Sequence, residues 1–519
     1  MKLIIVESFQ KTKVLKKYFK HDTIVSCNGH IIDLDPKTLS IEKKQNQYIP
    51  KYKFLNSYKS KFIQHLKKQK SKYDEIILAS DFDNEGEFIA QSLKKYLQLT
   101  NYNRIIFHSL AKKDLENAMS QKTKINNYIV HSQQTRRMID RLIGYQIQKV
   151  LGKQFSIGRN QSILLQFIKT KCENYEKKKT VYEITLINDA NETKTIELDF
   201  NPSNKKIRLL KKYTEVEYIF PHPLLSTSAI QLLAYQKHKI DPFLCTKILN
   251  ELYNKGLVTY IRTDAEVVNP AFIENCISKM HLEINFTNIK KLKSKYKSSN
   301  KPHEAIRPVS YTFPTNLSGN HKKVFELIYF TTIENFLHPI TIHSTYADIK
   351  IENTIKKIKI HEKIVNQGFN ELRKQKKAIP HFSIKNLKIS KSQKKQKRLD
   401  SLYTKTSLIK EMKTKKVATP STYDYSIKQL LQKKYITCTS SIYITEKGLF
   451  LLQFITKYFP KFTKITFIQN MYKNIDLIQN KQIDLNSVVS EVDKYINSQL
   501  KKIPVNYNLT KKWITTKNV

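Results

Sequence analysis

The first 125 residues alternate between short strand-like runs and helix-like runs, and this alternation constrains the fold more than any other feature. The strand-like runs are apolar, whereas the runs between them have the spacing of amphipathic helices. Strands that alternate with helices form a parallel sheet covered by helices, with a ligand site at the carboxyl ends of the strands. The expected strand and helix pairs are KLIIVES with QKTKVLKKYF, IVSCNGHIIDL with YKSKFIQHLKKQ, DEIILAS with EGEFIAQSLKKYL, and RIIFHS with KKDLENAM.

The rest of the chain is predicted to form several further domains around a β region that is left and re-entered. Two separated stretches have the period-two pattern of strands, and the residues between them have a helical pattern. The lysine-rich tract Ser390–Arg398 is interpreted as a solvated loop. The expected domains are residues 1–125, 126–178 with 400–519 (helical), 179–222 with 341–399 (β-rich), and 223–340 (helical insert).

Residues 227–259 and 406–437 resemble each other weakly. Each reads as a helix, a proline-containing turn, a second helix and a strand, so both look like helix-turn-helix units with a wing. In the second copy Cys438 stands in the place of Tyr260. A strand that follows directly on a helix pair of this kind is typical of DNA-binding folds.

Charge and cysteine usage restrict the class of partner and the compartment. The formal net charge is +48, which favours a polyanionic partner, nucleic acid more than a membrane surface. The five cysteines form no CxxC pair, so neither a disulfide framework nor a zinc ribbon is suggested. Without a signal peptide or a run of about 18 apolar residues, we expect a soluble, cytoplasmic protein.

The strongest acidic signal is DFDNEGE, residues 81–87, directly after an expected strand. Asp81 and Asp83 point to one side in extended chain, Glu85 follows as the helix begins, and Glu7 ends the first strand. Such a set of oxygen ligands suits Mg²⁺. The alternative is an exposed acidic helix start that the helix dipole favours.

Arginine is rare, because only 10 of the 92 basic residues are arginine. The planar guanidinium grips a phosphate with two hydrogen bonds, which lysine cannot do. Most of the arginines fall in a few short segments, and these are the candidate phosphate contacts: Arg104, Arg136, Arg137, Arg141, Arg159, Arg262 and Arg307.

Tyr260 lies in GLVTYIRTD, residues 256–264, which reads as a short strand. Arg262 falls on the same side of that strand and could hold a phosphate against the phenolic oxygen. A strand tyrosine is more often a packing residue, so spacing alone leaves both readings open. His30 and His303 are unremarkable polar residues on their own.

The motifs taken together resemble the type IA DNA topoisomerases. The resemblance runs from Lys2 to about Leu500, and it rests on eight motifs in order: VES with Lys11, GHIIDL, DFDNEGE, QQTRRMIDRLIGY, SIGRNQS, LVTYIRTD, HEAIRP and ATPSTY. It implies a Toprim domain, winged-helix-like domains and a β-rich arch that together form a toroid. It also implies cleavage of one DNA strand through a 5′-phosphotyrosyl link, strand passage and resealing, dependent on Mg²⁺ and independent of ATP.

Specific residues carry this resemblance. It implies that Tyr260 is the nucleophile, Arg262 its phosphate partner, Glu7 a general acid or base, and Lys11 a phosphate contact. Asp81, Asp83 and Glu85, with Glu7, would bind Mg²⁺. The expected DNA contacts are His30, Arg104, Arg136, Arg137, Asp140, Arg141, Arg159, Gln161, Ser162, Thr259, His303, Arg307, Ser421 and Thr422.

The chain also departs from the family pattern. Many relatives have Arg where Asn84 stands and an acid at Ser109 and Asn254, and others have Pro at Phe9 and Gly-Arg at Ala418-Thr419. No zinc-ribbon cysteines follow the core. The expected partner is single-stranded or negatively supercoiled DNA, bound by a monomer.

Other functions remain open at this point. A Toprim-type nuclease or primase would use the acidic cluster without Tyr260, a tyrosine recombinase would form a 3′ link, and a catalytically weakened protein would only bind single-stranded DNA. An ATP-driven topoisomerase is disfavoured because no GxxxxGK[ST] loop is present.

Overall fold

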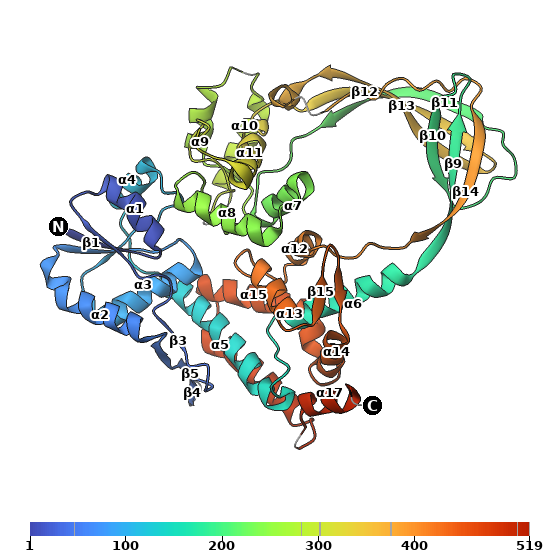
Figure 1. Cartoon of the computed structure of the whole chain (residues 1–519). Helices are drawn as coiled ribbons and strands as arrows, with labels where there is room; N and C mark the ends of the chain where they lie inside the picture. The colour runs from blue at the N-terminus through green and yellow to red at the C-terminus, as the bar shows by residue number, and fades with distance from the viewer. Residues whose placement is uncertain (46, 282, 300–302, 374–375, 506, 518–519) are drawn as a thin grey trace.

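The computed structural model describes residues 1–45, 47–281, 283–299, 303–373, 376–505 and 507–517. Its ribbon follows a ring: the long helix α5 (Asn127–Leu151) leads to α6 (Gln161–Glu176), which enters a β-rich part, and the chain then returns to helices beside the N-terminus (Figure 1). No helix of the described part is long and apolar enough to cross a membrane. We name the parts the N-terminal segment (1–125), the base segment (126–178 and 400–519), the β segment (179–222 and 341–399) and the tyrosine segment (223–340).

The N-terminal segment contains the expected parallel sheet, with strand order β2-β1-β7-β8. Two expected strands are shorter than predicted: IVSCNGHIIDL is divided, because Gly29 turns the chain at a φ of +83°, and RIIFHS keeps only β8. The sheet strands are β1 (Lys2–Val6), β2 (Thr23–Ser26), β7 (Glu75–Ala79) and β8 (Asn103–Arg104). The helices are α1 (Phe9–Tyr18), α2 (Ser57–Gln69), α3 (Asn84–Leu97) and α4 (Lys112–Ser120), with a 3-10 turn η1 (Lys70–Lys72). Two small antiparallel pairs join β3 (Ile32–Leu34) to β6 (Tyr52–Phe54) and β4 (Ile41–Lys44) to β5 (Gln47–Pro50).

Strands β1 and β7 are central because both of their faces are apolar. Leu3 and Leu78 pack into one buried cluster, whereas Ile4 and Ile77 pack into another cluster on the opposite face. Burial on both faces is the pattern of a strand covered by helices on two sides. Their parallel register pairs the last residue of β1 with the last residue of β7, so the chain leaves both strands at one edge.

The β segment consists of two antiparallel sheets, ordered β10-β9-β14 and β11-β12-β13. The tract Ser390–Arg398, expected as a solvated loop, instead forms most of β14. Cross-strand ion pairs make this possible, since Lys395 pairs with Glu183 on β9 at 2.6 Å and neighbouring lysines point into solvent. The strands are β9 (Lys178–Ile187), β10 (Thr193–Leu198), β11 (Arg208–Ile219), β12 (Ile340–Ile351), β13 (Thr354–Asn366) and β14 (Lys388–Arg398), with a 3-10 turn η2 (Gly368–Leu372).

The tyrosine segment is helical, and its GLVTYIRTD run is irregular chain with bends rather than the expected strand. The Thr259 N–H donates to the Arg307 carbonyl at 3.0 Å, whereas the Tyr260 N–H donates to the His108 carbonyl at 2.9 Å. Because successive residues bond to different neighbours, no ladder forms, and Val258 makes only an isolated bridge with Pro308. The helices are α7 (Thr227–His238), α8 (Pro242–Asn254), α9 (Pro270–Ile277), α10 (Phe286–Lys297) and α11 (Gly319–Glu334).

The base segment carries the second copy of the helix pair. Here the expected strand is present, as the hairpin of β15 (Ile436–Cys438) and β16 (Ile442–Ile444). The repeat is therefore real for the helix pairs α7–α8 and α12–α13, and incomplete for the wing. The helices of this part are α12 (Lys405–Thr414), α13 (Tyr423–Gln432), α14 (Glu446–Tyr458), α15 (Ile465–Gln479), α16 (Leu485–Leu500) and α17 (Leu509–Lys517), with a 3-10 turn η3 (Pro460–Thr463).

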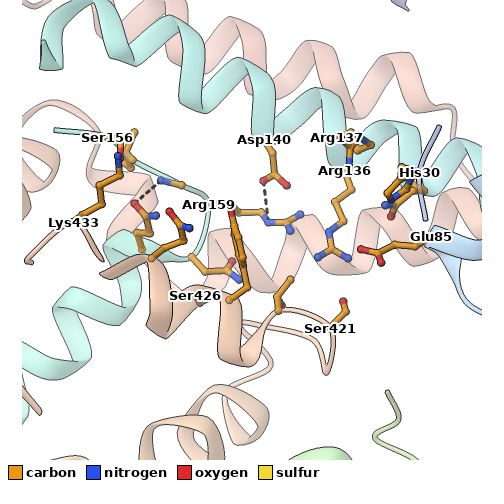
Figure 2. Close-up of a pocket in the computed structure, with 18 residues that line it drawn as sticks. His30, Glu85, Arg136, Arg137, Asp140, Ser156, Arg159, Ser421, Ser426 and Lys433 are labelled. Carbon is orange, nitrogen blue, oxygen red and sulfur yellow. Dashed lines mark hydrogen bonds and ion pairs between the residues drawn. The ribbon is translucent and has the colours of Figure 1, made fainter. Parts of the chain in front are cut away.

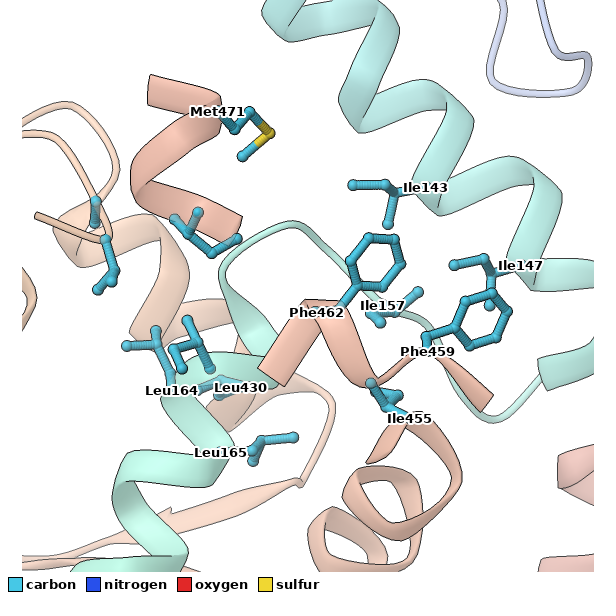
Figure 3. Close-up of a cluster of buried hydrophobic side chains, with 14 of the residues drawn as sticks. Ile143, Ile147, Ile157, Leu164, Leu165, Leu430, Ile455, Phe459, Phe462 and Met471 are labelled. Atoms are coloured by element: carbon cyan, nitrogen blue, oxygen red, sulfur yellow. The ribbon is translucent and has the colours of Figure 1, made fainter. Parts of the chain in front are cut away.

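A large apolar cluster joins the two sequence-distant halves of the base segment. Phe459, which precedes η3, and Phe462, which lies within it, stack at 5.8 Å between ring centroids and pack with Ile143 and Ile147 of α5 (Figure 3). Both rings are essentially excluded from solvent. This core fixes α5, and with it the residues that α5 presents to the site.

We predict that Phe459→Ala destabilises the base segment by about 3–5 kcal/mol, because it removes a buried ring and leaves a cavity. Urea unfolding followed by tryptophan fluorescence measures the change, since the single Trp513 lies in this segment. Phe286→Ala is the matched control: that ring is 69% exposed, and its loss should cost at most about 0.5 kcal/mol. Equal effects of the two substitutions would contradict the assignment of this core.

Candidate active site

Acidic side chains gather at the carboxyl edge of the parallel sheet. The Asp81 N–H donates to Glu7 Oε2 at 3.3 Å, which joins the ends of β1 and β7. Asp83 caps α3 by accepting from the Gly86 N–H at 2.7 Å. Gly86 is required here, because a Cβ at that position would lie 2.1 Å from the Asp81 carbonyl oxygen. The tight turn therefore places Glu85 in the first turn of α3, beside the other acids.

Basic and phenolic donors from elsewhere in the chain meet three of these carboxylates. Lys11 of α1, which is 2% exposed, pairs with Asp81, and the Tyr260 hydroxyl donates to Asp83. Arg262 donates from Nη1 to Glu85 Oε2 at 2.9 Å. The structure thus brings the sequence-predicted tyrosine and arginine to the acidic cluster, although 177 residues separate each from its partner.

These contacts set the charge state of the site. Burial would raise the pKa of Asp81 and of Glu85, but Lys11 and Arg262 respectively keep both below the usual range. Burial raises the pKa of Tyr260 well above its usual value, and the Asp83 carboxylate raises it further. The phenol is therefore protonated as long as it faces Asp83.

Glu7 and Asp83 are the two carboxyls whose pKa is raised although cations lie nearby. Burial, and then the charge of Asp81, raises the pKa of Glu7 to about 7. Burial also raises the pKa of Asp83; Arg262, whose Nη1 lies 3.7 Å from Asp83 Oδ2, offsets part of this effect, whereas Glu85 and Asp81 add to it. Negative charge is thus in excess over Lys11 and Arg262, and oxygen donors with excess negative charge suit a hard divalent cation.

The arrangement of the acids nevertheless differs from the expected metal site. Among the described residues, no group of three or more His, Cys, Asp or Glu side chains is arranged to hold a metal ion. The physical reason is that Asp81, Asp83 and Glu85 each point to a protein donor. The donor set fits Mg²⁺ chemically, and binding by it would require these side chains to turn from Lys11, Tyr260 and Arg262.

Aromatic rings surround the Tyr260 side chain. The His303 ring lies 4.9 Å from the Tyr260 ring, and the Tyr253 ring meets it edge-on at 5.5 Å. Burial, and then the neighbouring His108, lowers the pKa of His303 to about 4, so its imidazole is neutral. His108 and Tyr253 were not expected here; His108 follows a sheet strand, and Tyr253 precedes Tyr260 by seven residues, but neither spacing is a specific signal.

A cavity of about 640 Å³ lies between α5 and the start of α13 (Figure 2). A smaller cavity of about 270 Å³ shares Glu85, Arg136 and Ser421 with it and reaches Arg262 and His303. The two therefore form one path toward Tyr260. The larger cavity is lined by eight of the expected DNA contacts: His30, Arg136, Arg137, Asp140, Arg159, Gln161, Ser421 and Thr422.

Several buried polar atoms along this path have no hydrogen-bond partner among the described residues. Arg159 is only 6% exposed, its Nη1 has no partner, and its Nε lies 3.5 Å from Asp140 Oδ1. Gln133 Oε1 and Asn160 Oδ1 are also unsatisfied. Figure 2 shows Arg136 and Arg159 pointing into the same space. Burial, and then the charge of Arg159, lowers the pKa of Arg136, so an anion placed between them would be favoured.

Three of the expected DNA contacts, Arg104, Arg307 and Thr259, have polar groups that are engaged within the protein. Arg104 is fully buried and donates to Glu87 Oε2 at 3.1 Å and to the Ser80 carbonyl at 2.9 Å. Arg307 is buried against Glu304 with Nη2–Oε1 at 2.7 Å, and Thr259 donates to the Ala305 carbonyl at 2.9 Å. These polar groups are therefore engaged inside the protein, which favours a structural role for all three residues.

Three other expected DNA contacts either do not line the two cavities or are paired with another residue of the protein. Arg141 Nη2 donates to the Leu34 carbonyl at 3.0 Å and does not line either cavity, and Ser162 is buried outside the lining. Arg137 lines the larger cavity but pairs with Asp33. Tyr425 and Lys433, in contrast, line the cavity and were not anticipated.

Comparisons with known proteins identify the family to which the chain is similar. The profile of the family described as DNA topoisomerase matches residues 124–490, and the Toprim domain profile matches residues 2–110. DNA topoisomerase 1 of Aquifex aeolicus is 27% identical over 97% of this chain and 100% of its own length. DNA topoisomerase 1 of Campylobacter jejuni is 26% identical over 94% of this chain and 77% of its own length.

The fold has a solved counterpart in the full-length topoisomerase I of Thermotoga maritima. The TM-score is 0.82 at 23% identity, and the match covers 96% of this chain and 90% of that one. A Toprim sheet whose acidic edge meets a tyrosine from a separate helical segment defines the type IA class of topoisomerase. Because the family profile covers more than half of the sequence, the chain belongs to the DNA topoisomerase family.

The raised pKa of Glu7 predicts a pH-dependent stability. The folded protein holds the Glu7 proton up to a pH of about 7, whereas the unfolded chain loses it near the ordinary value of 4.5. The Glu7 proton therefore contributes its full amount to the free energy of unfolding below the pKa of the unfolded state. This contribution is lost as the pH rises through the pKa of Glu7 in the folded state. By pH 8 the loss should be about 3 kcal/mol.

Glu7→Gln removes this titration, so the substituted protein should lose less stability than the parent between about pH 5 and pH 8. Thermal unfolding in metal-free buffer across that range measures the difference. Parallel stability curves for the two proteins would show that Glu7 is ionised throughout.

Proposed function

We propose that this DNA topoisomerase cleaves one DNA strand by attack of the Tyr260 phenolic oxygen on a backbone phosphorus. The link formed is a 5′-phosphotyrosine, the bond broken is that between phosphorus and the 3′ oxygen, and resealing reverses the exchange. The observation that carries the proposal is the position of Tyr260: its hydroxyl lies at the acidic edge, beside Arg262, where a polar path ends.

The protonation states support separate roles for Glu7 and Asp83, the two acids whose pKa is raised. Asp83 already accepts the hydrogen bond of the Tyr260 hydroxyl and has a raised pKa, so it can take the phenolic proton as the phosphate approaches. Glu7, whose pKa of about 7 leaves about half of it protonated at neutral pH, can give a proton to the departing 3′ oxygen. Arg262 and Lys11 supply positive charge for the phosphate. The planar guanidinium of Arg262 can also donate two hydrogen bonds to it.

Mg²⁺ fits the same edge as a cofactor. Asp81, Asp83 and Glu85, with Glu7, would hold it, and when bound it would offset charge at the phosphoryl group. The expected requirement for Mg²⁺ and not ATP follows the family resemblance. The excess of acids over bases at this edge supports the choice of a divalent cation.

The proposed substrate is single-stranded or negatively supercoiled DNA. The path lined by Arg136 and Arg159 has unsatisfied donors for phosphate oxygens, and aromatic side chains such as Tyr425 and Tyr472 border it or contact its arginines. Phosphate contacts with interspersed aromatic rings are the usual means of holding single strands. We propose action as a monomer, in the cytoplasm, where the DNA lies.

Tyr260→Phe tests the central claim. It removes one oxygen and keeps the ring between His303 and Tyr253, so the fold and single-strand binding should persist while cleavage and relaxation disappear. The measurement is denaturation of a mixture with labelled single-stranded DNA, followed by peptide mapping of the adduct. We expect the protein on the 5′ end of the fragment that lies 3′ to the break, so a label at the 3′ end of the DNA should stay with the protein, and the adduct should map to residues 257–262.

Each competing function gives another result. A Toprim-type nuclease would retain cleavage in Tyr260→Phe without an adduct, a recombinase would leave a 3′ adduct, and a protein that only binds would cleave nothing. Arg262→Lys sharpens the test. The substitution keeps the positive charge but removes the planar guanidinium that can donate two hydrogen bonds to a phosphate. Adduct formation should therefore fall about 10- to 100-fold.

Arg136→Ala tests the proposed DNA path. Single-strand affinity should fall about tenfold or more, and the slope of log affinity against log salt should shrink by about 0.7. Fluorescence anisotropy at several salt concentrations measures both. Arg208→Ala is the matched control, because Arg208 is exposed on β11, outside both cavities. If both variants lose affinity equally, the path is elsewhere.

A further inference from the structure

Tyr253 links the tyrosine segment to the acidic cluster of the N-terminal segment. It lies in the last turn of α8, is 3% exposed, and packs in the apolar core of the tyrosine segment. Its hydroxyl nevertheless leaves that core and donates to Asp81 Oδ1 at 3.2 Å. The Tyr253 side chain thus packs in the core of the tyrosine segment and also binds the acidic cluster of the N-terminal segment.

The ring of Tyr253 makes two further contacts with the site. It meets the Tyr260 ring edge-on, at 5.5 Å between centroids and an interplanar angle of 75°. The Lys11 ammonium lies 5.3 Å from its centroid. Tyr253 therefore touches the proposed nucleophile, a proposed metal carboxylate and the lysine paired with that carboxylate. Packing alone would need the ring and not the hydroxyl, since phenylalanine buries the same surface without a polar atom to satisfy.

We propose that Tyr253 is a positioning residue with two separable tasks. Its hydroxyl orients the Asp81 carboxylate, and its ring holds Tyr260 in place. This inference rests on the proposed function. It explains how the acidic cluster of the N-terminal segment and Tyr260 of the tyrosine segment are aligned with each other. When a strand passes between the tyrosine and N-terminal segments, the Tyr253–Asp81 bond must break, and its return realigns the carboxylate and the nucleophile together for resealing.

Two contacts at this boundary that lie outside the acidic cluster do not share that property. Ser8 Oγ lies 3.5 Å from Asn254 Oδ1, and the Tyr260 N–H donates to the His108 carbonyl at 2.9 Å. These contacts hold the two segments together, but neither joins the acidic cluster to the Tyr260 side chain. A substitution at Tyr253 should therefore have effects that ordinary loss of a boundary contact would not produce.

The experiment separates the two tasks by two substitutions. Tyr253→Phe removes only the hydroxyl, and Tyr253→Leu removes the ring as well. Tyr48→Phe is the matched control, because its buried hydroxyl also donates to a carboxylate, Asp493 Oδ2 at 2.9 Å, away from the site. Two quantities are measured in the full chain: the Mg²⁺ concentration that gives half of the maximal shift in unfolding temperature, and the rate of adduct formation at Tyr260 on a single-stranded oligonucleotide.

For Tyr253→Phe we expect the half-maximal Mg²⁺ concentration to rise about tenfold, the usual effect of losing a hydrogen bond that orients a metal ligand. Its adduct rate should stay close to that of the parent. Tyr253→Leu should show the same Mg²⁺ shift and a fall in adduct rate of about 10- to 100-fold, because the nucleophile is no longer held. Tyr48→Phe should leave both quantities unchanged.

Two results would overturn the inference: a Mg²⁺ midpoint in Tyr253→Phe equal to that of Tyr48→Phe, or adduct rates that do not differ between Tyr253→Phe and Tyr253→Leu. Should Tyr253→Leu fail to fold, Tyr253→Met replaces it in the comparison, because the flexible, unbranched methionine side chain can fill an irregular gap. Failure of the proposed function is distinguishable, since the parent would then form no adduct or Tyr260→Phe would still form one.

Discussion

Burying four carboxylates at one edge of a sheet costs free energy, and the rest of the site is built around that cost. Lys11 and Arg262 neutralise Asp81 and Glu85, whereas Glu7 and Asp83 respond by holding their protons more tightly. The tyrosine segment supplies one of the two cations. Closure of that segment therefore stabilises the acidic cluster, and opening it leaves the acids free for another positive partner.

The opposite side of the tyrosine segment is held by a different kind of contact. Lys413 pairs with Glu266 at 3.0 Å and Lys405 pairs with Asp241, which joins α12 to the tyrosine segment. All four side chains are partly exposed, and ion pairs of this kind contribute little, about 0–1 kcal/mol each. Contacts that are individually weak and charged can break and re-form, as strand passage through the ring requires, without loss of the core within each segment.

Local patterns were enough to predict the parallel sheet and the convergence of Glu7 with Asp81, because strand ends in a parallel sheet share an edge. For Tyr260 and Arg262 the spacing left two readings open, and only the family resemblance implied that the two residues act together. Local patterns could not predict Tyr253, whose partner Asp81 lies 172 residues away and leaves no periodic signal. The expected strand at Tyr260 failed for the same reason, since its backbone partners are His108 and Arg307 rather than one neighbouring strand.

The arginines show how residue type alone misleads. The same planar fork that suits a phosphate also suits carbonyl oxygens and carboxylates, so Arg104 and Arg307 satisfy buried groups of the protein while Arg136 and Arg159 face a cavity. In HEAIRP the distinction could have been found, because Glu304 precedes Arg307 by three residues and can take both of its nitrogens. Arg104 offers no such local clue, since Glu87 reaches it from α3. In this lysine-rich chain, an arginine therefore indicates a position where a planar guanidinium is needed. Only the fold shows whether its hydrogen bonds go to acceptors of the protein or face a cavity.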